Sequence, residues 1–341
     1  MTRTDIRFGL PSKGILEKGA VDFLRNCGMN IFRPNPRQYA ASIPNLPGVS
    51  VLFQRPGDIV VGIREGSVDF GITGYDILAE KAYANPDILI LHDALGFGPC
   101  TLDLAVPEEL PIRSMADVYA WAETLAHDSK KLRIATKFPN LTRDTLEKHA
   151  ITNYKLIGAE GTLEIAPAIG YADMIADLVS SGITLRDNHL RLVKDGQILR
   201  SEAVLAANKI ALKTRPEVLH VAQKLLEYTE AYLRAQGSYS ITVNMRGNSP
   251  ETIAQKVFAQ TSIGGLQGPT IAPVVARENL RNGTNWYAIN IIVQKDQLFE
   301  AVAELRSIGG SGVIVTPCAY IFEEEPARYR AMLEALADDN S

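Results

Sequence analysis

The sequence predicts an α/β protein whose last third is a small ferredoxin-like domain. Two patterns carry this prediction. Before residue 237, short apolar strands alternate with segments of helical periodicity, which is typical of βαβ units with right-handed crossovers. After residue 237 the expected order is βαββαβ. The 341 residues, 46% hydrophobic and 22% charged, are enough for two or three domains with real cores.

The first part of the chain reads as two successive α/β groups. For the first group we expect strands at 6–10, 49–53, 68–72 and 88–91, with a helix over 15–27. A crossing strand is expected at 102–106. For the second group we expect strands at 132–136, 154–157 and 172–178, with helices at 142–149 and 163–169, and a further strand at 202–208 and a long helix at 216–234 follow it. Short apolar strands separated by helices place the loops after each strand at one edge of a sheet.

The pattern of expected strands and helices changes after Gly237. Strands are expected at 239–245, 270–277, 286–294 and 312–317, and helices at 250–260 and 296–308. Pro250 suits the first turn of its helix. Residues 326–341 form an acidic tail, partly helical.

Composition restricts the classes of function. The formal charge of −4 gives no general attraction to nucleic acid, so none is expected as a partner. Three widely spaced cysteines without a CxxC pair argue against a disulfide framework or a structural zinc site. The sequence shows no signal-peptide pattern and no apolar run of about 18 residues, so we expect a cytoplasmic protein that does not enter a membrane.

The strongest candidate site follows the strand expected at 172–178. A loop of small and hydroxyl residues at the carboxyl end of a strand can turn backbone N–H groups and hydroxyls toward a phosphate. Acidic residues beside it suit ribose hydroxyls or a magnesium ion. An ordinary serine-rich turn is the competing interpretation. The residues concerned are Glu160, Gly161, Thr162, Glu164, Asp173, Asp177, Ser180, Ser181, Gly182, Ile183 and Thr184.

Other strand-end loops carry candidate partners for an anion. Lys13 and Gly14 follow Leu10 after the first strand, Arg55 follows the strand at 49–53, and Gly74 and Asp76 follow the strand at 68–72. Phe138 lies in the loop 135–143 beside Lys137 and Arg143. For Arg55 a surface ion pair, and for Asp76 a turn or helix cap, are the competing interpretations. The five histidines are scattered, and no hydrolase motif stands out.

These segments, in this order, resemble the ATP phosphoribosyltransferase family, the first enzyme of histidine biosynthesis, in its long form. The resemblance covers nearly the whole chain and rests on several motifs in register. They are Leu-Pro-Ser-Lys-Gly at 10–14, Arg-Pro-Gly-Asp-Ile at 55–59, Asp-Phe-Gly-Ile-Thr-Gly-Tyr-Asp at 69–76, Leu-Gly-Phe-Gly at 95–98, Ile-Ala-Thr-Lys-Phe-Pro-Asn-Leu at 134–141, Glu-Ile-Ala-Pro at 164–167 and the acidic and serine-rich stretch 172–185.

The resemblance implies two lobes of the type II periplasmic-binding-protein kind around a catalytic cleft. Lobe I would comprise 1–100 and 190–235, lobe II 101–189, and the ferredoxin-like regulatory domain 237–325. It also implies the reaction. Adenine N1 of ATP attacks C1 of 5-phosphoribosyl 1-diphosphate, with magnesium, and diphosphate leaves. Because N1 carries no proton to remove, positioning and charge stabilisation can supply most of the catalysis, and no acid or base is assigned.

The resemblance further implies residue roles. The stretch 160–184 would hold the phosphoribosyl group, with Asp173 and Asp177 as magnesium ligands. Leu10, Lys13, Gly14, Arg55, Gly74, Asp76 and Phe138 would face ATP or the diphosphate. Ile263, Gly265, Leu266 and Thr270 would belong to an allosteric site for L-histidine as inhibitor, in a homo-oligomer that grows from dimer to hexamer.

Two departures from the family pattern affect these expectations. Ile15 stands where many relatives carry arginine, and the loop 261–265 differs from the usual Thr-Pro-Gly form. Three alternatives stay open on sequence: a ligand-binding module without catalysis, a phosphoribosyltransferase that uses another nucleophile, and a weakly active homologue kept for regulation.

Overall fold

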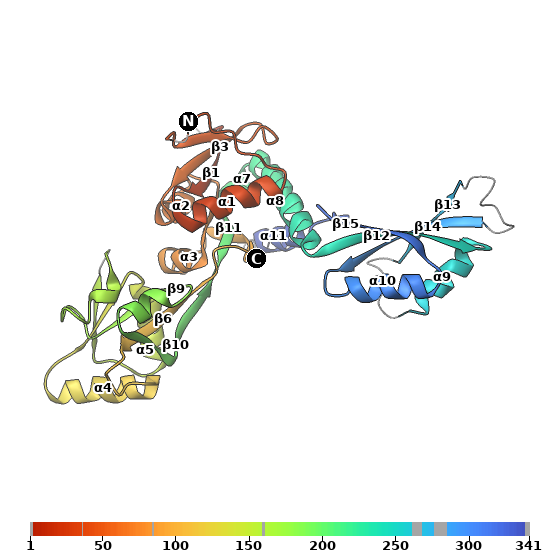
Figure 1. Cartoon of the computed structure of the whole chain (residues 1–341). Helices are drawn as coiled ribbons and strands as arrows, with labels where there is room; N and C mark the ends of the chain where they lie inside the picture. The colour runs from red at the N-terminus through yellow and green to blue at the C-terminus, as the bar shows by residue number, and fades with distance from the viewer. Residues whose placement is uncertain are drawn as a thin grey trace. The chain divides into compact units, whose positions relative to one another are not determined.

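The computed structural model describes residues 3–35, 37–83, 85–158, 161–260, 268–275 and 285–337. The chain divides into two compact units (Figure 1). Unit 1 consists of Met1–Leu226 and Ala327–Ser341, and unit 2 of Glu227–Pro326. Unit 1 contains two sheets, which define lobe I and lobe II, and unit 2 contains one sheet.

Lobe I is built on a six-stranded sheet in the order β2-β3-β1-β4-β11-β5. Strands β3 and β4 run parallel to β1, whereas β11 is antiparallel to both of its neighbours. Its strands are β1 (Ile6–Pro11), β2 (Ala40–Ser42), β3 (Val49–Gln54), β4 (Phe70–Gly74), β5 (Ile88–His92) and β11 (Ala203–Asn208). Its helices are α1 (Gly14–Asn26), α2 (Pro56–Arg64), α3 (Tyr75–Ala82), α7 (Lys209–Thr214) and the first part of α8 (Pro216–Ala235).

The middle strands of lobe I are buried on both faces. Every residue of β4 and of β11 is buried, as expected for central strands covered by helices on both sides. The core below α2 gathers Ile59, Ile63, Leu78 and Val204, each at most 5% exposed. Each such side chain contributes roughly 1.5–3 kcal/mol relative to leaving it in water.

Lobe II is built on a five-stranded sheet in the order β10-β6-β9-β7-β8. Its strands are β6 (Cys100–Pro107), β7 (Leu132–Thr136), β8 (Tyr154–Gly158), β9 (Met174–Val179) and β10 (Leu190–Ser201). Its helices are α4 (Met115–His127), α5 (Pro139–Lys148), the 3-10 helix η1 (Leu163–Ile165) and α6 (Ile183–Asp187).

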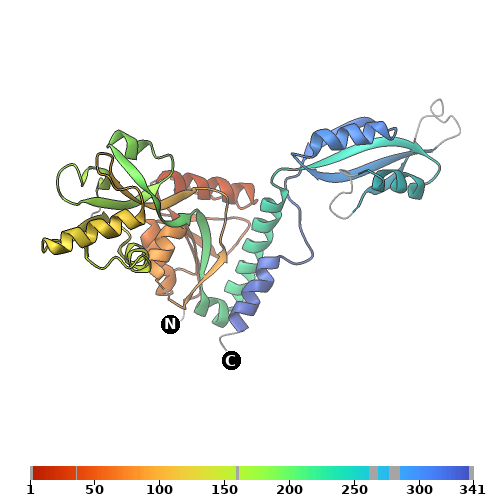
Figure 2. The same cartoon turned by 90° about the horizontal axis from the view of Figure 1, so that it is seen from below.

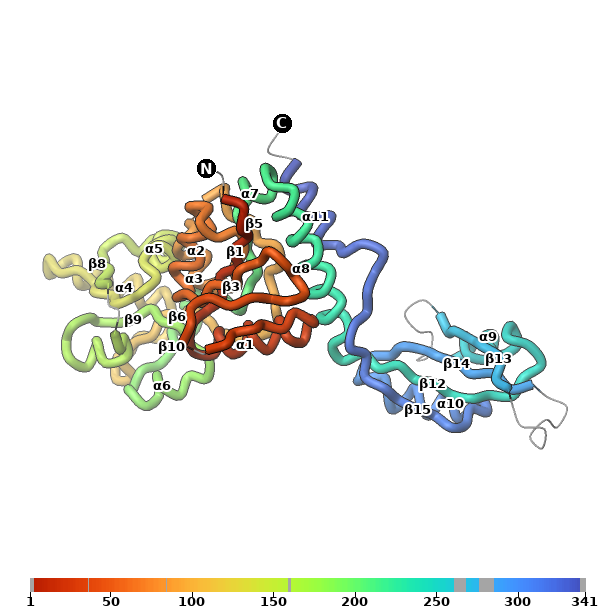
Figure 3. The backbone as a smooth tube through the Cα atoms, turned by 90° about the horizontal axis from the view of Figure 1, so that it is seen from above, coloured from red at the N-terminus to blue at the C-terminus, as the bar shows by residue number. Residues whose placement is uncertain are grey.

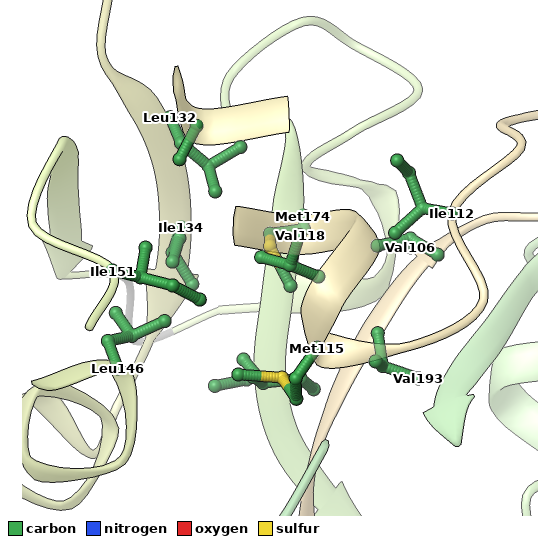
Figure 4. Packing of buried hydrophobic residues seen from close by; sticks show 13 residues of the cluster. Val106, Ile112, Met115, Val118, Leu132, Ile134, Leu146, Ile151, Met174 and Val193 are labelled. Carbon is green, nitrogen blue, oxygen red and sulfur yellow. The ribbon is translucent and has the colours of Figure 1, made fainter. Parts of the chain in front are cut away.

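Alternating residues of the lobe II strands build two cores. One core packs α4 and α5 on the sheet (Figures 2 and 4) and contains Leu104, Val106, Ile112, Met115, Val118, Leu132, Ile134, Leu146, Ile151, Met174 and Val193. The other core lies on the opposite face, where Ala105 and Ile175 meet Leu163 of η1 and Leu185 of α6. The second core therefore fixes the two short helices that flank the carboxyl end of β9.

The two lobes share one topology. In each, a first strand lies between a parallel second strand and a parallel third strand, and the next position holds an antiparallel strand that arrives from the other lobe. Residues 93–99 and Glu202 form the two crossings between the lobes. This arrangement is the type II periplasmic-binding-protein fold, which the family resemblance implies.

Two segments of lobe II differ from expectation. Residues 190–201, placed in lobe I by the sequence analysis, form β10 and pair with β6. The helix expected over 163–169 ends at Ile165 as one 3-10 turn, because residues 166–170 continue as turns.

Unit 2 has the expected ferredoxin-like order. Its sheet order is β13-β14-β12-β15, all antiparallel, which is the split βαβ arrangement. The elements are β12 (Ser238–Gly247), α9 (Pro250–Phe258), β13 (Thr270–Val274), β14 (Asn285–Gln294), α10 (Leu298–Ser307) and β15 (Ser311–Pro317). A reciprocal cap between Ser249 and Thr252 starts α9.

The segment expected as an acidic tail contains a helix that packs on lobe I. Helix α11 (Ala327–Ala337) lies against β5 and α7 (Figure 3) and buries Met332 and Leu336. Arg328 pairs with Asp93 at 2.5 Å. Within the described ranges, no helix is long and apolar enough to cross a membrane.

Candidate functional site

A small pocket lies at the carboxyl end of β9, where the sequence predicts the phosphate loop. Its volume is about 50 Å³. It is lined by Glu164, Asp177, Leu178, Val179, Ser180, Ser181, Gly182, Thr184 and Leu185. Gly182 adopts a φ of 69° and begins α6, so the chain turns sharply from strand to helix at this point. The structure thus gathers most of the predicted phosphoribosyl residues around one hollow.

The rim of this pocket is polar and accessible. Ser180, Ser181 and Thr184 are exposed, and Ile183 between them is 53% exposed. Gly161 and Thr162 are also exposed, directly before η1. Glu160 lies outside the described residues. Hydroxyls and backbone N–H groups in such a turn are suited to an anion.

Asp177 is an acidic residue of this pocket whose pKa its surroundings shift. Burial raises the pKa of its carboxyl, and nearby Glu164 raises it further. The Leu178 N–H, which donates to Asp177 Oδ1 at 2.8 Å, and the charge of Lys137 act in the opposite direction. Glu164 and Asp177 both line the pocket, and Lys137 directly follows Thr136, which pairs with Ala176 beside Asp177.

Asp173 does not join this group. It precedes β9, and Arg133 holds its carboxylate with two side-chain donors at 2.7 and 3.2 Å. Four residues of extended strand separate Asp173 from Asp177, which is about 13 Å. A spacing of four residues puts both side chains on one face of the strand but at its opposite ends. The shared site expected from sequence is therefore not formed.

Asp103 is a buried acid that the sequence analysis missed. It sits directly opposite Asp177 in the β6–β9 register and is 4% exposed. Its Oδ2 atom has no hydrogen-bond partner among the described residues, and burial raises the pKa of its carboxyl. The available signal was a single aspartate inside an otherwise apolar strand.

The loops of lobe I present two cations at the carboxyl edge of its sheet. Lys13 and Gly14 are exposed at the start of α1, and Arg55 is exposed at the start of α2. Leu10 is fully buried in the lobe I core, so its side chain does not face this edge. Of the predicted lobe I residues, Lys13 and Arg55 therefore have side chains available to an anion.

Asp76 is buried rather than offered to solvent. It is 4% exposed, and its Oδ1 atom accepts a hydrogen bond of 2.6 Å from the Ser201 hydroxyl. The same hydroxyl accepts from the Asp76 N–H at 2.9 Å. Burial raises the pKa of the Asp76 carboxyl. A Cβ at Gly74 would lie 2.3 Å from Asp76 Oδ1, so any other residue there would displace the Asp76 carboxylate. The pair expected to face the nucleotide instead ties α3 to the end of β10.

Phe138 is also buried, at 1% exposure, and its N–H donates to Thr136 Oγ1 at 2.9 Å. Its ring is therefore part of lobe II packing. In the residues described, no group of three or more His, Cys, Asp or Glu side chains is placed to hold a metal ion. Of the predicted allosteric residues, Thr270 begins β13 and is exposed, whereas Ile263, Gly265 and Leu266 lie outside the described residues.

A larger cavity of about 980 Å³ adjoins the pocket and shares Val179 and Ser180 with it. Both crossings contribute to its lining, through Pro99 and Glu202, and so do the adjoining strand ends Cys100 of β6 and Ser201 of β10. Its volume lies in the range of small-ligand sites. Space for a ligand therefore exists beside the crossings as well as at β9.

Comparison with known proteins decides the family. The profile described as ATP phosphoribosyltransferase matches residues 55–231, and the profile of the HisG C-terminal domain matches residues 235–320. The chain belongs to the ATP phosphoribosyltransferase family. It is therefore a transferase with the C-terminal domain of the long form, as the motifs in the sequence indicate.

Individual relatives agree with this assignment. The chain is 43% identical over 340 residues to ATP phosphoribosyltransferase 1, chloroplastic, of Arabidopsis thaliana, covering 98% of this chain and 82% of that protein. It is 32% identical to an ATP phosphoribosyltransferase of Caulobacter vibrioides, with 98% of each covered. A solved ATP phosphoribosyl transferase (HisG:HisZ) complex from Thermotoga maritima has a TM-score of 0.52 at 25% identity, covering 66% of this chain and 98% of that one.

Proposed function

We propose that the chain condenses ATP with 5-phosphoribosyl 1-diphosphate to give N1-(5-phosphoribosyl)-ATP and diphosphate, the first step of L-histidine biosynthesis. A bond forms between adenine N1 and ribose C1, and the C1–O bond breaks with its electron pair leaving on diphosphate. The pocket at the end of β9 supports the proposal, because hydroxyls, backbone N–H groups and carboxylates that gather in one pocket are suited to a ribose phosphate.

Within this pocket the roles divide by chemistry. Ser180, Ser181 and Thr184 would donate hydrogen bonds to the 5-phosphate, and the turn at Gly182 would add backbone N–H groups. Asp177 and Glu164 would accept from the ribose hydroxyls. Gly161, Thr162 and Ile183 would line the approach. Because no proton is removed from adenine N1, these residues contribute by position and charge.

Magnesium fits this set of residues only in company with the substrate. It is usually held by one or two carboxylates together with substrate phosphates. Asp177 and Glu164 form such a carboxylate pair, whereas Asp173 is engaged by Arg133. We therefore assign Asp177 and Glu164 as the residues that would hold magnesium, which would neutralise charge on the leaving diphosphate.

On the opposite side, Lys13 and Arg55 would contact the diphosphate or the triphosphate of ATP. Both are exposed cations at strand-end loops of lobe I. Leu10, Asp76 and Phe138 are buried and would support these loops rather than touch the substrates. Gly14 and Gly74 would allow the backbone to turn there.

Unit 2 would carry regulation. We expect L-histidine to inhibit through unit 2, at a site including Thr270, and the chain to assemble from dimers to hexamers. The family match over 235–320 supports a regulatory role.

The three cysteines form no disulfide in the described structure, which suits a reducing compartment, and we place the protein in the cytoplasm.

The test is turnover of ATP and 5-phosphoribosyl 1-diphosphate with magnesium, followed by ultraviolet absorbance of the product. Thr184→Val should raise KM for 5-phosphoribosyl 1-diphosphate by tenfold or more, since a hydrogen bond to a charged group is worth roughly 1.5–3 kcal/mol. Thr124→Val, on an exposed face of α4, is the matched control and should leave KM unchanged. Tight binding of both substrates without product would favour a binding module and contradict the proposal.

A further inference from the structure

Helix α3 belongs to lobe I, yet one of its faces makes its polar contacts outside that lobe. Asp76, Glu80 and its C-cap residue Tyr83 follow each other at intervals of four and three residues, which puts them on one side of a helix. We call this set the joining face. Two like charges at this spacing are unfavourable unless each carboxylate is satisfied by donors.

Each member of the joining face has a partner that belongs to lobe II or to a crossing. Asp76 exchanges two hydrogen bonds with Ser201, the last residue of β10. Tyr83 donates from its hydroxyl to Asp144 Oδ1 of α5 at 2.7 Å. The contacts of Glu80 lie between these two and are the most numerous.

Glu80 of lobe I caps the N-terminus of α5, which belongs to lobe II. Its Oε1 and Oε2 atoms accept from the Asn140 N–H at 3.0 and 3.1 Å, and Oε2 also accepts from the Leu141 N–H at 3.0 Å. Helix α5 has no side-chain cap of its own from Phe138. A carboxylate at this end satisfies first-turn N–H groups and matches the helix dipole. Glu80 is 6% exposed, so water competes little.

The loop that Glu80 holds leads directly into the candidate site. Residues 137–138 connect β7 to α5, and Lys137 directly follows Thr136, which pairs with Ala176 beside Asp177. Moving the first turn of α5 would therefore move Lys137 relative to Asp177. Asp76 belongs to the same helix as Glu80 and fixes α3 to Ser201 at the end of β10, so both attachments are set by one helix.

We propose that Glu80 is a positioning residue, which through α5 places Lys137 for the binding of 5-phosphoribosyl 1-diphosphate, and that the joining face fastens lobe I to lobe II. The binding part of this inference rests on the proposed function. The fastening part concerns only hydrogen bonds that the structure contains, so the two parts can be tested by separate measurements.

The experiment uses Glu80→Ala and Glu80→Gln in the full chain, with Glu65→Gln, an exposed glutamate of lobe I, as matched control. Hydrogen–deuterium exchange of the first turn of α5 reports fastening. It should accelerate at least tenfold at Asn140 and Leu141 in Glu80→Ala, and less in Glu80→Gln, which keeps one acceptor oxygen. The control should match the unaltered protein.

Calorimetry with 5-phosphoribosyl 1-diphosphate and magnesium reports positioning. The Kd and KM for 5-phosphoribosyl 1-diphosphate should rise about tenfold in Glu80→Ala and severalfold in Glu80→Gln. The change in kcat should be smaller, because misplaced binding groups weaken the binding of that substrate more than they slow the reaction. Should Glu80→Ala fail to fold, Glu80→Gln decides alone.

The outcomes separate the claims. Unchanged exchange in both variants would overturn fastening, and faster exchange with unchanged Kd would overturn positioning. If the unaltered protein binds 5-phosphoribosyl 1-diphosphate but forms no product with ATP, the proposed function fails, whereas an altered Kd and exchange in the variants would still support the role of Glu80.

Discussion

The loops that follow β4 in lobe I and β9 in lobe II occupy equivalent places in one topology, yet they are used in opposite ways. After β4, the first N–H groups of α3 are taken by protein: Tyr75 donates to the Glu202 carbonyl at 2.9 Å and Asp76 to Ser201. After β9, α6 begins at Gly182 without a side-chain cap, and its neighbours Ser181 and Thr184 are exposed.

This difference shows that position in the fold does not by itself decide where a ligand binds. A strand-end loop is a ready anion site only when its donors stay accessible. In lobe I the donors of this loop are taken by Ser201 and Glu202, and the hydrogen bonds between Asp76 and Ser201 join α3 to β10. In lobe II the same place stays polar and open, beside Asp177.

The largest expected effect concerns acid, to which a buried histidine of lobe I and an acidic residue of lobe II should respond with opposite sign. His92 of lobe I is buried, and burial together with the charge of Arg328 lowers its pKa from 6.5 to about 4. Its neutral form is favoured in the folded state, so its contribution is present above pH 6.5 and is lost as pH falls through about 4. The loss is on the order of 3 kcal/mol.

His92→Asn tests this, because asparagine can still accept from the Ala94 N–H that Nδ1 accepts at 3.2 Å. Chemical denaturation at several pH values should show a flatter acid slope in the variant. Asp177→Asn in lobe II is the counterpart: its raised folded pKa favours the folded state as pH falls, so removing it should steepen the acid slope. Parallel slopes for all three proteins would contradict the assignment.

The next effect compares one substitution in both loops. Gly74→Ala should lower the free energy of unfolding by about 2–3 kcal/mol, since its Cβ displaces Asp76 from Ser201 and leaves a buried carboxylate without that donor. Gly182→Ala meets nothing closer than Val179 at 4.0 Å and should cost only about 1 kcal/mol for its positive φ. Thermal unfolding measures both, and equal losses would remove the contrast between the two loops.

The smallest effect comes from two serines. Ser201→Ala should destabilise by about 1–2 kcal/mol, because Asp76 loses its hydroxyl donor. Ser180→Ala, at an exposed position, should change stability by less than about 0.5 kcal/mol while raising KM for 5-phosphoribosyl 1-diphosphate. If Ser180→Ala lowers the free energy of unfolding and leaves KM unchanged, Ser180 contributes to stability and does not bind the substrate.

Much of this architecture could be predicted from local pattern. The strand expected at 132–136 is β7 with the same bounds, and the order of unit 2 follows from its alternation. Small and hydroxyl residues after β9 also suffice to propose a pocket. Pattern failed where distance through space decides: Asp173 and Asp177 look like one acidic pair, and only the length of the strand separates them.

Other features have no local signature at all. Glu80 belongs to a helix of lobe I, and nothing in its sequence neighbourhood reveals that α5 lies beside it. Asp76 reads as an acceptor at a ligand edge until Ser201, far along the chain, is placed on it. Strand β10 was missed because charged and polar residues interrupt its apolar pattern at several positions.

The return of α11 to lobe I gives the order of synthesis a structural meaning. Met332 and Leu336 cover β5 and α7, but the ribosome adds them only after the whole of unit 2. At roughly 5–20 residues per second, the surface they cover waits several seconds or more in the nascent chain. Unit 2 is thus an insertion within lobe I, and a chain cut after Pro326 would leave that surface bare.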